Sequence, residues 1–109
     1  MSSELSAILR ALADPSRRAQ LQRLSHGPAT SGQLAELLTM SRPAGSQHLA
    51  VLINAGLINS TPAGRHRWHE IRPEYLYLAE SWLGGVLRQW ESAPTLQLSD
   101  REPRVAQRS

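Results

Sequence analysis

The 109-residue sequence contains no cysteine, and this absence excludes several kinds of site. Structural disulfides, thiolate metal ligands and thiol-based redox sensing all need a cysteine sulfur atom. Long apolar runs are absent too, because no stretch approaches the ~20 residues that cross a bilayer. The first residues, Met-Ser-Ser-Glu-Leu, lack the basic and apolar segments of a signal peptide. We therefore expect a cytoplasmic protein with no membrane partner.

Lysine is also missing, so all twelve basic residues are arginine. Two explanations stay open: the arginine fork suits guanine edges and phosphate oxygens, and a genome-wide coding bias would produce the same composition. The position of the charges says more than their type. Residues 1–72 hold eight arginines and four acids, whereas the remaining residues are close to neutral. The positive excess therefore precedes the last predicted helix.

Two helices are predicted at the start of the chain. The first runs from about Ser3 to Ala13, because its apolar residues recur at helical spacing: Leu5, Ile8, Leu9 and Leu12. Asp14 and Pro15 then start the second, since aspartate accepts hydrogen bonds from free amides at an N-cap and proline suits the first helical position. His26-Gly27-Pro28 ends it after about Ser25.

Residues 28–57 predict two more short helices joined by a tight turn. Thr30 and Gln33 have the spacing of a capping box at the start of the first, which carries an apolar stripe of Leu34, Leu37 and Leu38. Ser41 is the expected N-cap of the second. Two short helices in this arrangement are typical of a helix-turn-helix that binds DNA.

Beyond residue 57 the pattern changes to a hairpin and then a long helix. Strands are predicted at Leu57–Ser60 and Arg65–Ile71 around a loop at Thr61–Gly64. Pro73 opens the helix, which ends before Pro94. Residues 94–109 are polar, mixed in charge and without periodicity, so we predict a mostly disordered tail. The length indicates one domain, at residues 1–93.

The second helix of the helix-turn-helix is the predicted DNA-reading element. With Gly45, Leu49 and Leu52 on its inner face, small and hydrogen-bonding side chains face outward: Pro43, Gln47, Ala50 and Asn54. Such a face suits the major groove, which is ~12 Å wide and lined with donors and acceptors. A plain solvated helix face is the alternative interpretation.

Within this helix we assign different contacts to different residues. Gln47 is the first candidate for a base edge, Ser46 for a base or a phosphate, and Arg42 for a phosphate or guanine. His48 lies near the buried side, so a packed histidine and a DNA contact are both open. In the hairpin, Arg65 and Arg67 are expected on one side and suit the phosphate backbone or a minor groove. An ordinary charged edge hairpin is the alternative.

These segments resemble the ArsR/SmtB-type family of bacterial winged helix-turn-helix repressors over most of residues 5–83. The similar stretches are Ala11–Arg18, Ser41–Leu49, Asn54–Leu57 and Gly64–Arg67. The resemblance implies a mainly α fold with a small β-hairpin, in which two helices precede the helix-turn-helix and the wing and a last helix follow. It also implies that Ser46, Gln47, His48, Arg65 and Arg67 face DNA, and that the first and last helices pair in a homodimer. The interface residues would be Leu5, Ile8, Leu9, Leu12, Tyr75, Ala79, Trp82, Leu83, Val86 and Trp90.

The sequence departs from the metal sensors of that family. It has no cysteine at the start of the third helix and no histidine in the last one. His66 and His69 are three apart in a predicted strand, hence on opposite faces, so we expect no metal and no cofactor. Gly45 stands where members of that family usually have a larger apolar residue, and it is expected to loosen the second helix of the helix-turn-helix.

Four functional hypotheses follow. The first is a dimeric repressor, including an autorepressor, that binds an inverted repeat in promoter DNA. The others are a winged-helix protein-interaction module, a repressor with a ligand or metal at a non-standard site, and an enzyme. We expect no enzyme, because Ser46 and His48 point to different sides of a helix and no catalytic motif accompanies them. Trp82, Trp90 and Tyr75 suit either an apolar pocket or plain packing, and the sequence names no effector.

Overall fold

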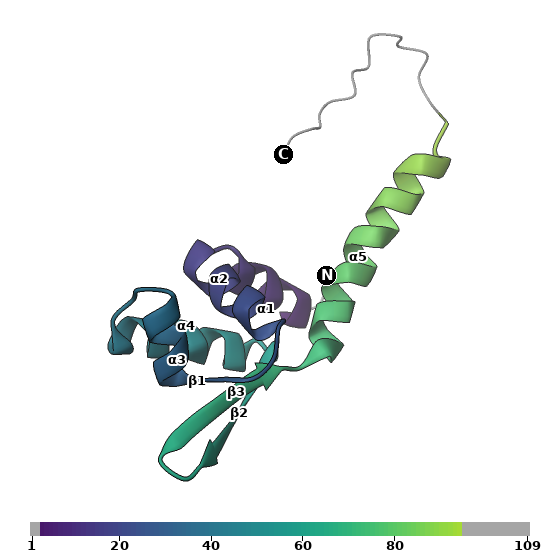
Figure 1. Ribbon diagram of the computed structural model, residues 1–109. Coiled ribbons are helices and arrows are strands. Elements are labelled where there is room, and N and C mark those ends of the chain that lie inside the picture. Colours follow the sequence, from purple (N-terminus) through teal and green to yellow (C-terminus); the bar gives the residue numbers. More distant parts are fainter. Residues whose placement is uncertain (1–2, 95–109) are drawn as a thin grey trace.

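Five helices and three short strands make up residues 3–94, the part of the chain that the computed structural model describes (Figure 1). They follow the order α1 (Ser3–Leu12), α2 (Pro15–Leu24), β1 (Ala29–Thr30), α3 (Ser31–Leu37), α4 (Arg42–Asn54), β2 (Ile58–Ala63), β3 (His66–Ile71) and α5 (Pro73–Ser92). The predicted order of helices and hairpin is confirmed. The predicted tail, apart from Pro94, lies outside the described residues.

The corner between α1 and α2 satisfies its own free backbone groups. The Asp14 Oδ1 atom accepts hydrogen bonds from the amides of Ser16 at 2.7 Å and Arg17 at 3.3 Å, as predicted for an N-cap. In the other direction, Arg17 donates to the carbonyl of Ala11 at 2.7 Å and Arg18 to that of Leu12 at 2.8 Å. One short segment therefore starts α2 and caps the end of α1.

The helix-turn-helix begins at the two predicted caps. Thr30 and Gln33 form a full capping box at the start of α3, and the Ser41 hydroxyl accepts from the amide of Ala44 at the start of α4. The two helices end with the same turn. Thr39, with φ 49°, and Gly56, with φ 80°, each follow a helix cap in the left-handed conformation. Glycine adopts this conformation freely, whereas threonine does not.

The three strands form one antiparallel sheet in the order β1-β3-β2. The hairpin loop differs from the prediction, because β2 continues to Ala63 and only Gly64 and Arg65 connect the strands. Pro62 is compatible with a strand here since β2 lies at the sheet edge, where a missing N–H group is tolerated. Strand β1 was not predicted. Its two residues, Ala29 and Thr30, form a strand only through their pairing with His69 and Trp68.

The core lies between the first four helices and the inner face of the sheet. Its buried side chains come from every helix: Leu5, Ile8, Ala11, Leu24, Ala29, Leu34, Leu49, Leu52, Ala55, Leu57, Ile58 and Ala79. Helix α5 contributes only Ala79, and Figure 1 shows it running away from the body after its first turns. The hairpin projects on another side. None of the helices in residues 3–94 is both long and apolar enough to cross a membrane.

Candidate nucleic-acid interface

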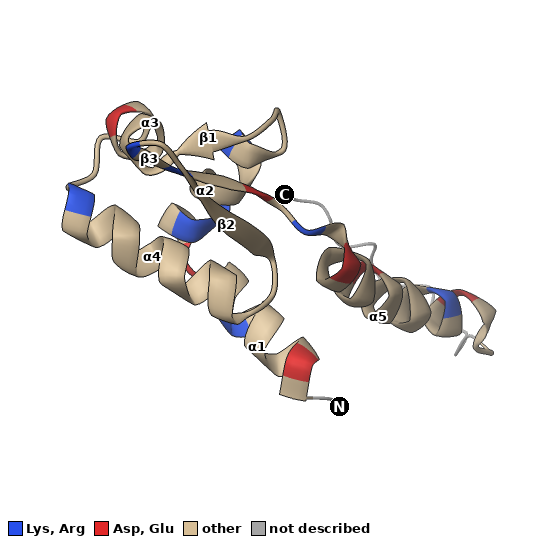
Figure 2. Ribbon diagram, turned by 90° about the horizontal axis from the view of Figure 1, so that it is seen from below, with Lys and Arg blue, Asp and Glu red and all other residues tan. Residues whose placement is uncertain are grey.

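Helix α4 presents the outer face that its sequence predicts. Gly45, Leu49 and Leu52 are buried against the core. The opposite side is exposed and short in side chain or polar: Pro43, Ser46, Gln47, Ala50 and Asn54. Helix α4 contains no acidic residue, and Figure 2 shows it without red along its length and with blue at its start. This face lacks the carboxylates that would repel a phosphate backbone.

Helix α4 is held against α2 by a buried amide. The Gln20 side chain is fully buried, and its Nε2 atom donates to the carbonyl of Gly45 at 3.2 Å. A methyl group on Gly45 would lie 3.3 Å from the sulfur of Met40. The small residue therefore leaves room for the Met40 side chain against α4. The bond from Gln20 uses only the backbone carbonyl of Gly45, so the expectation that the glycine loosens the helix stays a prediction.

His48 is half-buried and points toward the α1–α2 corner. Its Nδ1 atom lies 3.2 Å from Nη1 of Arg17, whose Nε and Nη2 atoms donate to the carbonyls of Ala11 and Arg10. Of the two open interpretations, this geometry favours a packed and bonded histidine. The sequence did not identify Arg17 as its partner, because the two residues are 31 positions apart.

The three predicted DNA-binding arginines differ in their surroundings. Arg42, the first residue of α4, lies beside the start of α3, where a methyl group on Gly32 would meet its Nη1 atom at 3.6 Å. Arg67 pairs with Pro62 in the hairpin, and Arg65 lies in the loop. The prediction that Arg65 and Arg67 lie on one side assumed that both belong to the strand. This assumption is wrong, because β3 begins only at His66.

The electrostatic balance of this region is positive. Residues 61–68 of the hairpin contain two arginines and no acid, and all of them are exposed. Within residues 3–94 the ion pair found is Arg72 with Glu74 at 4.0 Å, so no carboxylate neutralises Arg42, Arg65 or Arg67. Figures 1 and 2 show the start of α4 and the free end of the hairpin on the side of the molecule away from α5.

A polar cluster that the sequence analysis missed joins the hairpin to α3. His69 is only 2% exposed, and its Nε2 and Nδ1 atoms lie 2.7 Å from the Ser31 hydroxyl and 2.6 Å from the Ser60 hydroxyl. Burial, with a smaller contribution from the charge of Arg67, lowers the pKa of His69, so the ring is neutral near pH 7. One signal in the sequence could have indicated that His69 is buried: strand alternation places it on the same face as the apolar Ile71.

The structure also bears on metal binding. His66 is exposed on the outer face of the hairpin, opposite Ala63, whereas His69 is buried on the inner face, opposite Ser60. The prediction that these two histidines lie on opposite faces is confirmed. In the part of the chain that the structure describes, no three His, Asp or Glu side chains gather in a way that could hold a metal ion.

Comparison with known proteins identifies the family. The model of the bacterial regulatory proteins of the arsR family matches residues 14–60, which run from the N-cap of α2 through the helix-turn-helix into β2. The HTH-type transcriptional regulator Rv2034 of Mycobacterium tuberculosis is 46% identical over 94 residues, which cover 84% of this chain and 85% of that one. The chain belongs to the ArsR family.

Two further comparisons agree with this assignment. The transcriptional repressor SdpR of Bacillus subtilis is 29% identical over 72% of this chain and 88% of its own length. A crystal structure of an ArsR family transcriptional regulator, RHA00566, superimposes with a TM-score of 0.77 and is 41% identical over 84% of this chain and 94% of that chain. The winged helix-turn-helix fold of this ArsR-family chain is thereby confirmed.

The residues predicted at a dimer interface fall into three groups by burial. Leu5, Ile8 and Ala79 are buried within the chain itself, so they have almost no surface to offer a second chain and belong to its core. Leu9, Leu12 and Tyr75 are half-buried. The exposed remainder, with Leu87 added, forms a continuous row on α5 that we name the α5 stripe: Trp82, Leu83, Val86, Leu87 and Trp90.

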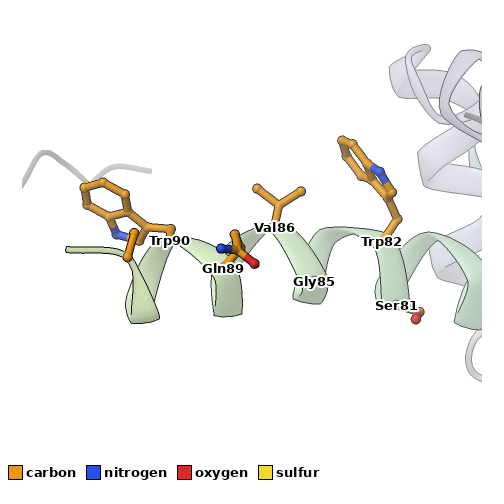
Figure 3. Close-up of a pocket in the computed structure, with 7 residues that line it drawn as sticks. Ser81, Trp82, Gly85, Val86, Gln89 and Trp90 are labelled. Atoms are coloured by element: carbon orange, nitrogen blue, oxygen red, sulfur yellow. The ribbon is translucent and has the colours of Figure 1, made fainter. Parts of the chain in front are cut away.

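The α5 stripe is an apolar surface with a hollow of about 620 Å³ beside Trp82 and Trp90. These two tryptophans are 41% and 58% exposed. Figure 3 shows Trp82, Val86 and Trp90 on one side of α5 and Ser81 on the other. Large contiguous apolar patches are rare on isolated soluble chains and mark contact surfaces.

Proposed function

We propose that this ArsR-family protein is a dimeric repressor that binds an inverted repeat in double-stranded DNA. The observation that carries the proposal is the exposed, acid-free outer face of α4 next to an arginine-bearing hairpin. In winged helix-turn-helix geometry, such a helix lies in the major groove while the wing follows the backbone.

The α4 residues divide by reach and chemistry. Gln47, exposed in the middle of the outer face, has an amide that pairs bidentately with adenine. Ser46 beside it has a shorter hydroxyl for a base or a phosphate. Arg42 at the helix start, together with the free amides there, suits a phosphate. His48 acts through its bond to Arg17, which holds the ring against the body rather than toward the groove.

The hairpin supplies the second contact. Arg65 and Arg67 are two exposed cations without a carboxylate partner among the described residues. Each guanidinium group can donate two parallel hydrogen bonds to the oxygens of a phosphate, and this contact does not depend on base sequence. We expect the wing to contribute affinity and α4 to contribute specificity.

Dimerisation supports the proposal through the α5 stripe. Five large apolar side chains project from a helix that leaves the body of the protomer, and a second copy would cover them. A two-fold axis through such a pair repeats α4 on both sides and therefore favours an inverted repeat. A repressor of this kind acts by occupying promoter DNA. We therefore expect the protein in the cytoplasm, where that DNA lies. The naming of SdpR as a transcriptional repressor supports this role.

The experiment that tests the proposal is selection of bound duplexes from a random double-stranded DNA pool at low and near-physiological salt. We expect enrichment of an inverted repeat and an affinity that falls steeply with salt, because bound phosphates release counterions. The variant R65A/R67A should reduce the salt dependence while it leaves the enriched sequence unchanged. A folded dimer that enriches no sequence would overturn the proposal in favour of a protein partner.

A further inference from the structure

We infer that Ser31, His69 and Ser60 form a clamp that fixes the wing relative to the helix-turn-helix and so positions Arg65 and Arg67 on DNA. This inference rests on the proposed function and adds three positioning residues to it. None of the three touches DNA in the proposal. Their role is to act through the arginines at the end of the hairpin.

The clamp spans three separate elements. Ser31 is the first residue of α3, Ser60 lies in the middle of the edge strand β2, and His69 lies between them in the central strand β3. Ser60 and His69 are directly opposite in the register, as are Ala29 and His69. The two bonds, of 2.6 and 2.7 Å, therefore run across the sheet from its edge to the first helix of the helix-turn-helix.

The chemistry of the ring suits this bridging role. A neutral imidazole has one donor and one acceptor nitrogen, and a hydroxyl can take either part. Both bonds can consequently form together whichever nitrogen of His69 carries the hydrogen. A buried polar group is costly unless it is bonded, so a wing position that breaks either bond is disfavoured. Apolar packing alone would lack this directional requirement.

The clamp lies where the hairpin leaves the body of the protein. On the inner face of the hairpin the opposed pairs are Ile58 with Ile71, then Ser60 with His69, then Pro62 with Arg67. The first pair packs in or against the core, whereas residues 61–68 are all exposed. His69 is therefore the last buried residue before the wing leaves the body.

Small movements at the clamp become large at the wing end. Arg65 lies four positions before His69, which corresponds to roughly 13 Å of extended chain, so a tilt of about 10° moves the end by about 2 Å. A shift of about 2 Å breaks a hydrogen bond to phosphate, whose ordinary length is about 2.9 Å. Loss of one clamp bond should therefore weaken the wing contact without removing the arginines.

A double-mutant cycle tests the inference on the full-length protein. The change Ser60→Ala is made alone and in the R65A/R67A background, and affinity is measured on the duplex enriched by selection, or on a mixed-sequence duplex if none is enriched. Ser31→Ala is the second clamp variant. Ser25→Ala is the matched control, because its exposed hydroxyl makes only a local bond to the Gln22 carbonyl.

We expect each clamp variant to lower DNA affinity about tenfold with the wing arginines present and less than about twofold without them, since residues that act as a unit are not additive. An equal loss in both backgrounds would overturn the clamp and leave the wing contact standing. If R65A/R67A itself leaves the affinity unchanged, the wing contact of the proposed function fails, and the clamp fails with it. Ser25→Ala should bind as the unsubstituted protein does.

Discussion

Arg17 joins the end of α1 to α4: its Nη1 atom lies 3.2 Å from Nδ1 of His48, while its other nitrogens donate to the carbonyls of Ala11 and Arg10. One guanidinium thus caps one helix and bonds a side chain of another. The planar, five-donor shape of arginine makes this possible, and lysine would not replace it.

The change Arg17→Ala should lower the free energy of unfolding by about 1–3 kcal/mol, because the partly buried carbonyl of Ala11 loses the Arg17 donor and the exposed carbonyl of Arg10 loses one of its two donors. His48→Ala removes only the remaining bond and is the matched variant, with an expected loss of about 0.5–1.5 kcal/mol. Urea unfolding followed by circular dichroism measures both. Equal losses for the two variants would show that the carbonyl bonds of Arg17 contribute nothing.

The neutral state of His69 predicts a pH dependence of stability. Burial lowers its pKa in the fold below the ordinary value of 6.5, so the unfolded chain takes up a proton first as the pH falls. The free energy of unfolding should therefore fall on acidification below about pH 6.5, by at most about 1.4 kcal/mol per pH unit for one proton. At higher pH, His69 contributes nothing to the pH dependence of the free energy of unfolding.

Unfolding in urea at about pH 7.5 and about pH 5.5 measures this effect. The variant His69→Gln is the comparison, because glutamine can hydrogen-bond but does not titrate in this range. We expect the unsubstituted protein to lose more stability than His69→Gln between the two pH values. Identical losses would exclude His69 as the titrating group.

The two left-handed turns give opposite predictions. Thr39 holds φ 49° with a branched side chain, so Thr39→Gly should raise the free energy of unfolding by about 1 kcal/mol. Gly56→Ala should lower it by more than about 2 kcal/mol, because the unfavourable φ adds to a steric clash. A methyl group there would approach the ring of Tyr75 to 2.5 Å. Thermal or urea unfolding of both variants checks the signs.

The α5 stripe predicts the outcome of a charge placed in it. Val86→Glu should convert a dimer to monomer with little change in the protomer, since Val86 is exposed in the single chain. Ser92→Glu adds the same charge at an exposed position of α5 that does not line the hollow, and it should leave the dimer intact. Sedimentation equilibrium separates these results. A Val86→Glu protein that stays dimeric would place the interface elsewhere.

Local signals explain why much of the fold could be predicted. Asp14, Thr30 with Gln33, and Ser41 each cap a helix through groups two or three residues away, so their spacing alone locates the helix starts. The inner face of α4 follows from the helical period in the same way.

The features that the sequence did not reveal depend on distant partners. Strand β1 exists only because Ala29 and Thr30 pair with β3, and Pro62 fits a strand only because β2 is at the sheet edge. The bonds of Gln20 to Gly45 and of His69 to Ser31 join residues 25 and 38 positions apart. Likewise, Leu5 and Ile8 are apolar on a suitable face, but only the packed fold shows that the core buries them.

Hydroxyl-radical footprinting of the dimer on the selected duplex tests the central claim most directly. Two α4 helices related by a two-fold axis predict two protected regions, symmetric about a dyad and about one helical turn, ~34–36 Å, apart. Gln47→Ala should relax base specificity within both regions equally. A single protected region without symmetry would contradict a dimer that reads an inverted repeat through α4.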